Sequence, residues 1–242
     1  MKEKIADTLP RRKPRATVDE FKEKNMRVVV TCGPSYEPID EVRRITNFST
    51  GELGTLLANH LVKAGCDVVC YRGVGATSHE RVVGARLVPF ATNQHLQSEL
   101  EELPQRETIN AVFHAAALCD YRVKSVHNST GTEVAASKIP SRAGELTLTL
   151  DPYSKLILNL RDLFPKSRIV GWKYELVGSR ADVLAAAIRQ LAESRTDGCV
   201  MNGAAYGGGF GFLEPQVKPQ HFIDKPALCQ HLAKWLKSKE KK

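Results

Sequence analysis

The sequence predicts an α/β fold, a doubly wound Rossmann-like parallel sheet with helices on both faces. Residues 28–31 form a run of β-branched side chains, which is typical of a parallel strand buried on both sides. Similar short apolar runs alternate with amphipathic stretches along the chain, the order expected of parallel strands joined by crossover helices. With 242 residues, of which 42% are hydrophobic, the chain has enough material for one large core.

The first half of the chain gives the clearest elements. Gly33-Pro34 ends the first strand, and a polar loop is expected from there through Asp40. Ser49 or Thr50 is expected to cap a helix that continues to residue 65, and its free N–H groups and dipole favour an anion. Further strands are predicted at residues 67–71, 86–90 and 110–117, and a helix at 93–103. Small residues end the strand at 115–117, where they would let a ligand approach the backbone.

The second half begins with a stretch that resembles a loop. Residues 121–136 are predicted to be a mobile loop, and residues 145–150 a strand that Asp151-Pro152 ends. The region around 121–150 is a candidate for a small β-rich dimerisation arm. Helices are expected at 153–164, 180–195 and 226–239, with strands at 168–172 and 199–202 and a glycine-rich segment at 203–211.

The net charge of +8 is concentrated at the two ends of the chain. Residues 1–25 hold eight basic and five acidic side chains, and residues 234–242 hold five lysines and one glutamate, so the ends carry +7. We therefore expect solvated tails, with a weak polyanion contact as the alternative, and no nucleic-acid-binding fold. The predicted division is a basic extension (1–25), an α/β domain (26–236) and a basic tail (237–242).

The six cysteines contain no CxxC pair, a pattern that favours reduced, buried thiols in the cytoplasm. No secretory signal is expected, and no apolar run approaches the roughly 20 residues needed to cross a membrane. No histidine pair has metal-ligand spacing, so no protein metal ligand is expected.

The segment from Thr31 to Gly51 carries a specific pattern, T-x-G-x-x-x-E-P-I-D-x-V-R-x-x-x-N-x-S-T-G. It resembles the opening of the phosphopantothenoylcysteine synthetase family, ligases of coenzyme A biosynthesis. The resemblance implies that Arg43 grips a substrate phosphate and that Asn47 polarises the activated acyl group. Both roles suit the side chains, because a guanidinium binds phosphate bidentately and an amide donates to an oxyanion without titrating. The plain alternatives are a solvated arginine and a turn asparagine.

Two later segments extend the resemblance. Residues 115–121, Ala-Ala-Ala-Leu-Cys-Asp-Tyr, resemble the family's A-A-A-V-x-D-[WFY], in which the aspartate contacts the nucleotide. Lys138-Ile139-Pro140-Ser141 resembles K-I-[KQ]-[KS], whose lysine binds the triphosphate. Lys138 lies 18 positions after Asp120, so the intervening loop is enlarged relative to the bacterial enzymes.

Weaker matches complete the expected site. Pro152 is retained from the family's N-P-D-I segment, Trp172 replaces a phenylalanine beside the base, and Arg189 takes the place of a helix lysine. Catalytic roles are expected for Arg43, Asn47 and Lys138, and substrate contacts for Arg43, Asn47 and Asn202. The expected nucleotide-binding residues are Gly33, Ser49, Thr50, Gly51, Ala117, Asp120, Lys138, Pro152, Trp172 and Arg189.

The resemblance implies a ligase that joins 4'-phosphopantothenate and L-cysteine by an amide bond. The carboxylate would attack the α-phosphate of CTP or ATP, with Mg²⁺ on the triphosphate, and cysteine would then displace the nucleoside monophosphate. It also implies a homodimer and a separate flavin-dependent decarboxylase as a partner in the pathway. The sequence leaves the choice between CTP and ATP open.

Two other functions stay open. A nicotinamide-dependent oxidoreductase shares the fold class, but the first turn has no G-x-G-x-x-G and the chain has no Tyr-x-x-x-Lys. A catalytically inactive nucleotide-binding homologue is favoured by the altered residues Glu52, Leu53, Pro140 and Gly203. Against it, four chemically different groups are retained together, namely Arg43, Asn47, Asp120 and Lys138.

Overall fold

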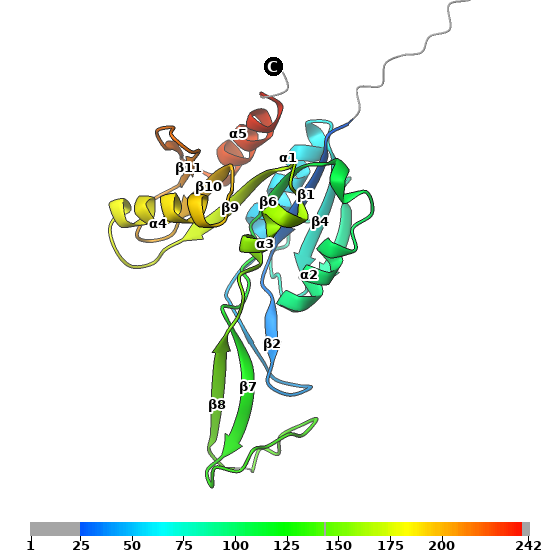
Figure 1. Ribbon diagram of the computed structural model, residues 1–242, viewed down its shortest axis with the longest axis vertical. Helices are drawn as coiled ribbons and strands as arrows, with labels where there is room; N and C mark the ends of the chain where they lie inside the picture. The colour runs from blue at the N-terminus through cyan, green and yellow to red at the C-terminus, as the bar shows by residue number, and fades with distance from the viewer. Residues whose placement is uncertain (1–24, 143, 239–242) are drawn as a thin grey trace, which may run out of the picture.

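An eight-stranded sheet forms the centre of the molecule (Figure 1). The computed structural model describes residues 25–142 and 144–238. The strand order is β12-β11-β10-β9-β6-β1-β4-β5, in which all neighbours from β10 to β5 are parallel. In chain order the parallel strands read 3-2-1-4-5-6, which is the Rossmann arrangement, so the predicted fold class is confirmed. Their bounds are β1 (Arg27–Cys32), β4 (Asp67–Gly73), β5 (Arg86–Phe90), β6 (Ile109–His114), β9 (Arg168–Tyr174) and β10 (Gly198–Asn202).

Helices cover both faces of the sheet. Because successive strand side chains point to opposite faces, Val28 and Val30 of β1 pack with α1 (Glu52–Lys63) and α5 (Lys225–Lys237). Val29 packs with α2 (Asn93–Glu101) and α3 (Leu156–Leu163) on the other face. On β10, Val200 belongs to the first face and its neighbours pack against α4 (Arg180–Glu193). These alternating apolar residues explain why the strands contain continuous hydrophobic runs.

Gly51 is the N-cap of α1, and this corrects the predicted cap. The sequence predicts Ser49 or Thr50 at this position, but Gly51 occupies it with a φ of 72° and no side-chain cap. A Cβ on Gly51 would lie 3.2 Å from the Cα of Gly33, so the backbone approach leaves no room for a larger capping residue. The Thr50 hydroxyl accepts a long hydrogen bond, 3.3 Å, from the N–H of Glu52.

A two-stranded antiparallel ribbon projects from the carboxyl edge of the sheet (Figure 1). It consists of β7 (Tyr121–Asn128) and β8 (Leu146–Pro152). The predicted mobile loop at 121–136 is therefore wrong for its first eight residues, where β-forming side chains alternate with polar ones along an exposed strand. Asp151 and Pro152, predicted to follow the strand, are instead its last two residues, because proline is tolerated at the end of a ribbon strand. The predicted β-rich arm around 121–150 is confirmed as a structural element.

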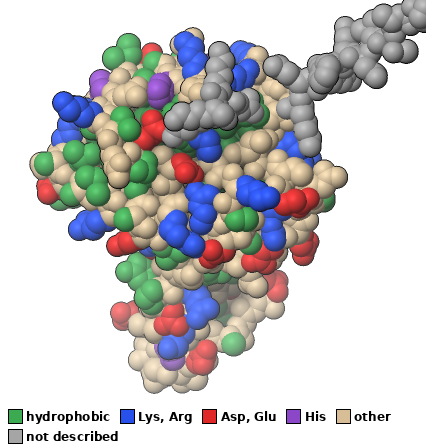
Figure 2. Space-filling model, turned by 45° about the horizontal axis from the view of Figure 1, so that its top comes forward, with side chains coloured by type: hydrophobic (Ala, Val, Ile, Leu, Met, Phe, Trp, Pro, Cys, Tyr) green, Lys and Arg blue, Asp and Glu red, His purple; other side chains and the backbone are tan. Residues whose placement is uncertain are grey.

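Short elements that were not predicted complete the fold. The expected polar loop after β1 contains a hairpin of β2 (Tyr36–Pro38) and β3 (Arg44–Thr46), paired through Glu37 and Ile45. The glycine-rich segment leads into β11 (Phe210–Leu213) and β12 (Gln220–Phe222), which run antiparallel at the sheet edge, and η1 (Arg106–Thr108) precedes β6. Most of the basic extension and tail lies outside the described residues. On the face shown in Figure 2, basic and acidic side chains are interspersed.

Candidate functional site

Three of the predicted site residues meet where β1 and β6 leave the sheet. Gly33 has a φ of 78° and accepts a hydrogen bond of 2.9 Å from the N–H of Ala117. A Cβ on Gly33 or on Gly51 would lie 2.9 Å from the Cβ of Ala76, which packs over both glycines. Because the strand order reverses between β1 and β6, this is the switch point at which open α/β sheets bind ligands.

Asn47 lies beside the same strand end. Its side-chain Nδ2 donates to the carbonyl of Leu118 at 2.8 Å. The neighbouring Cys119 thiol donates to the carbonyls of Ser35 at 3.7 Å and Ile45 at 3.9 Å, and burial raises its pKa. The amide has two N–H donors and Leu118 uses one, which leaves the second for a ligand at this exposed position.

A buried polar network that sequence reasoning missed supports this loop. The Ser35 hydroxyl donates to Asn93 Oδ1 at 2.6 Å and accepts from the N–H of Cys119 at 2.9 Å. Asn93 Nδ2 in turn donates to the carbonyl of Cys119 at 2.8 Å. All three residues are buried, so each polar group needs these partners. The network fixes the loop after β6 to the start of α2, and only tertiary contact brings its members together.

The β2–β3 turn clamps the segment that carries Lys138. Both terminal nitrogens of Arg43 donate to the carbonyl of Ile139 at 3.1 Å, and Arg43 Nη1 pairs with Asp40 at 2.5 Å. Asp40 accepts from the N–H of Ile139 at 3.1 Å, and Ile139 is buried. Burial raises the pKa of Asp40, but three backbone N–H groups and Arg43 outweigh it, so the pKa lies below its ordinary value. Lys138 is thus held next to Arg43 and stays exposed.

Arg43→Ala is expected to loosen this segment, because a hydrogen bond to a charged group contributes about 1.5–3 kcal/mol. Hydrogen–deuterium exchange at the Ile139 amide should accelerate by roughly 10-fold or more, while exchange in β1 stays unchanged. Arg44→Ala is the matched control, since the Arg44 guanidinium stacks on Tyr36, 4.7 Å from its ring centroid. Equal acceleration in both variants would contradict the clamp.

Asp120 and Pro152 lie together at the base of the arm. Pro152 pairs with Tyr121, and the N–H of Tyr153 donates to the carbonyl of Asp120 at 2.7 Å. The Asp120 carboxylate is 3.7 Å from the Lys155 ammonium, and both side chains are more than half exposed. The carboxylate therefore remains accessible to a ligand.

The last predicted contacts lie on β9, α4 and β10. Trp172 is half-buried against the α1–α5 face, and its indole N–H has no partner within the described part of the chain. Asn202 ends β10, and its Oδ1 is likewise without a described partner. Arg189 lies on the exposed side of α4, about 13 Å along the helix from Arg180 at roughly 1.5 Å per residue. The structure does not bring Arg189 together with the other predicted nucleotide contacts. Arg180, the first residue of α4, lies at the carboxyl edge instead, and it donates to the Tyr206 hydroxyl at 2.8 Å.

His114 holds the end of β6 next to the glycine turn. Its Nδ1 lies 2.8 Å from the Thr31 hydroxyl, and burial lowers its pKa to about 4 from 6.5. Between these values the unfolded chain binds a proton that the folded chain does not. Stability is therefore expected to fall as the pH drops from 6.5 to about 4, by roughly 3 kcal/mol from this residue alone.

Urea unfolding at several pH values tests this expectation. Carboxylates titrate in the same range, so the quantity to compare is the difference in the free energy of unfolding between the wild type and His114→Asn. That difference should shrink as the pH falls, because only the wild type loses stability through His114. Parallel pH dependence of the two proteins would show that His114 is not buried in its neutral form.

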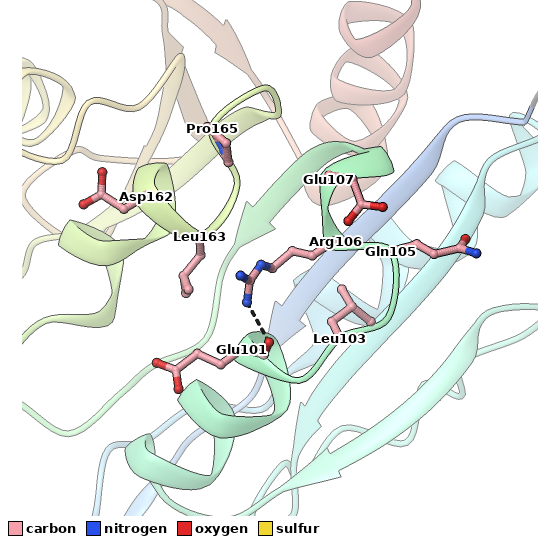
Figure 3. A pocket seen from close by; sticks show the side chains of 8 residues that line it. All are labelled: Glu101, Leu103, Gln105, Arg106, Glu107, Asp162, Leu163 and Pro165. Atoms are coloured by element: carbon pink, nitrogen blue, oxygen red, sulfur yellow. Dashed lines mark hydrogen bonds between the residues drawn. The ribbon is translucent and has the colours of Figure 1, made fainter.

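A separate hollow of about 340 Å³ lies at the opposite, amino edge of the sheet (Figure 3). It opens between the last turns of α2 and α3, and Arg106 donates to the carbonyl of Glu101 at 2.6 Å. Helix C-termini and the acidic side chains of Glu101, Glu107 and Asp162 disfavour an anion there. None of the predicted site residues lines it.

Within residues 25–142 and 144–238, no group of His, Cys, Asp or Glu is arranged to hold a metal ion. None of the helices described combines the length and apolarity needed to cross a membrane.

Comparison with curated proteins finds relatives that share one name. It is 28% identical over 177 residues to a coenzyme A biosynthesis bifunctional protein CoaBC from Thermococcus kodakarensis, covering 73% of this chain and 41% of the relative. The CoaBC of Bacillus subtilis is 28% identical over 185 residues, covering 76% and 42%. The chain thus spans less than half the length of these curated relatives.

Solved structures share the fold. The DNA/pantothenate metabolism flavoprotein from Streptococcus pneumoniae matches with a TM-score of 0.77 and 21% identity, covering 88% of this chain and 99% of that one. A Cab2 variant in complex with phosphopantothenate-cysteine matches with a TM-score of 0.65 and 17% identity, covering 88% and 85%. The family model of the DNA/pantothenate metabolism flavoprotein C-terminal domain matches residues 23–237. The chain therefore belongs to this family, the phosphopantothenoylcysteine synthetases that its motifs resemble.

Proposed function

We propose that the chain is a ligase that joins 4'-phosphopantothenate to L-cysteine through an acyl-nucleotidylate, using CTP or ATP. The observation that carries the proposal is the meeting of Gly33, Asn47, Gly51 and Ala117 at the switch point of the sheet. The names of the relatives support it, since they belong to coenzyme A biosynthesis and one solved relative holds phosphopantothenate-cysteine.

In this proposal the chain's groups divide the work of two displacements. The turns at Gly33 and Gly51 admit the triphosphate next to the backbone, and Lys138 offsets the charge that develops at the α-phosphate. Mg²⁺ would accompany the triphosphate, held mostly by phosphate oxygens and water. Asn47 donates its free N–H to the acyl oxygen when the amine attacks. Asp120, Trp172 and Asn202 contact the nucleotide and substrate.

Arg43 has a second role in this proposal. Its guanidinium already binds Asp40 and the carbonyl of Ile139, so it positions the Lys138 segment in addition to any contact with a substrate phosphate. This contact joins two motifs that lie far apart in the sequence, because Arg43 and Ile139 are 96 residues apart.

We also propose a homodimer, built through the β7–β8 arm. An isolated two-stranded ribbon is marginally stable in water, and large side chains of this arm, Tyr121 and Leu150, are exposed. Burial against a second copy would stabilise it. A flavin-dependent decarboxylase would consume the product. The names of the relatives support this partner, since the curated ones are called bifunctional and one solved relative is called a flavoprotein.

Pyrophosphate release tests the function. Purified protein is mixed with phosphopantothenate and Mg²⁺, with CTP or ATP, and with or without cysteine. Release that depends on phosphopantothenate, together with an amide product that depends on cysteine, is expected with one nucleotide or both. Absence of release from a protein that still binds nucleotide would instead favour the inactive homologue, which the altered Glu52 and Gly203 make the second candidate.

A further inference from the structure

Glu37 is a buried carboxylate, one oxygen of which has no hydrogen-bonding partner among the described residues. It lies in the middle of β2 and is only 8% exposed. Its Oε1 makes no hydrogen bond to any residue that the structure describes. An isolated carboxylate is expensive to remove from water, and buried polar groups are usually paired. An unpaired buried polar group in a folded protein calls for an explanation, and a ligand that supplies the missing partner is one such explanation.

The position of Glu37 connects it to Asn47. Glu37 faces Ile45 across the β2–β3 hairpin, and Asn47 follows two residues after Ile45. The Cys119 thiol lies 3.9 Å from the carbonyl of Ile45, and Asn47 Nδ2 donates to the carbonyl of Leu118, the residue before Cys119. The hairpin that carries Glu37 and the side chain of Asn47 therefore both border the Leu118-Cys119 segment, beside the end of β6 where we place the acyl group.

The groups that face Glu37 from the neighbouring elements are few. They are Arg122 from β7, Tyr153 after β8 and Cys119 after β6. Burial raises the pKa of Glu37 and Arg122 opposes this, with a net rise. Arg122 itself lies 3.8 Å from Asp151 and its side chain is 59% exposed, so it does not neutralise Glu37 by a direct ion pair. A carboxylate in this setting is a stronger base than one in water and attracts a cationic group.

Resting on the proposed ligase function, we propose that Glu37 binds the amino group of the amino-acid substrate and accepts the proton that this group loses. The substrate arrives as an ammonium ion, which supplies the missing donor to Glu37. Transfer of one proton to the carboxylate gives the neutral amine. Its nitrogen forms a bond to the acyl carbon, the bond from that carbon to the phosphate oxygen breaks, and the nucleoside monophosphate leaves with the electron pair. The second proton of the nitrogen is released to solvent.

Glu37→Gln tests the proposal because it keeps the shape and removes the base. Glu41→Gln is the matched control, since Glu41 lies exposed in the turn of the same hairpin. Pyrophosphate release with phosphopantothenate is expected at the wild-type rate in both variants. Cysteine-dependent amide formation should fall by about 10²-fold or more in Glu37→Gln alone.

Hydroxylamine separates a chemical role from a structural one. It is uncharged at neutral pH and attacks activated acyl groups without a base, so Glu37→Gln should form the hydroxamate as fast as the wild type. Equal loss with cysteine and hydroxylamine, or no loss with cysteine, overturns the role of Glu37. A wild-type protein that releases no pyrophosphate overturns the ligase function and this inference together, whereas release with an intact cysteine step in Glu37→Gln removes the inference alone.

Discussion

Asn47→Ala is expected to lower the rate of cysteine-dependent amide formation by about 10²–10³-fold, the usual effect of removing one donor to a developing oxyanion. Asn47 Nδ2 already donates to Leu118, so its side chain is oriented before any ligand binds and only its second N–H is available to the acyl oxygen. Pyrophosphate release should continue in the variant, because the proposed role begins only when the amine attacks. The rates are read in single-turnover experiments that follow both products.

Two further variants test whether the loss in Asn47→Ala comes from the missing donor: a second substitution at position 47 and a control at another amide. Asn47→Asp removes the donors and adds a negative charge, so it should be at least as slow as Asn47→Ala. Gln97→Ala removes an amide that bonds Glu101 on the same helix at 2.7 Å, and it should retain the wild-type rate. An Asn47→Ala protein that forms the amide at the wild-type rate would remove Asn47 from the reaction.

Gly54→Ala is expected to reduce the free energy of unfolding by about 3 kcal/mol, the upper end of the usual cost of overpacking. A Cβ at position 54 would lie 2.2 Å from the Cβ of Cys32, and both atoms belong to regular elements that cannot move alone. The helix α1 would have to separate from β1. Alanine is otherwise preferred in a helix by about 1 kcal/mol, so a stabilised variant would show that the close approach is absent.

Chemical denaturation measures this effect, and Gly208→Ala is the control. A Cβ on Gly208 would meet nothing within 4 Å, so that variant should stay within about 0.5 kcal/mol of the wild type. Because Cys32 immediately precedes Gly33, displacement of α1 in Gly54→Ala should also weaken nucleotide binding. Loss of stability without any change in nucleotide binding would show that the contact between Gly54 and Cys32 does not support the nucleotide site.

The local pattern of the sequence determined the strands and helices of the sheet. Residues 28–31 and 168–172 contain continuous apolar runs because both faces of those strands are covered, and this property is visible without any partner. The arm was harder to recognise, since only Val126 of β7 is buried and the composition of the segment is that of a polar loop. Strands that pair outside a core lack the regular apolar pattern that identifies a buried strand. Whether they form depends on pairing with the partner strand.

The sequence by itself determined the family, the switch-point turn and the candidate residues Gly33, Asn47 and Lys138. The tertiary structure alone decided how those residues are held. Asp40 reaches Ile139 across 99 positions, and Ser35 reaches Asn93 across 58. The burial that leaves one oxygen of Glu37 without a partner among the described residues also arises only when the hairpin packs against β7 and the loop after β6. Periodicity records which side of an element is buried, whereas the partner of a polar side chain depends on segments that only the folded chain brings together.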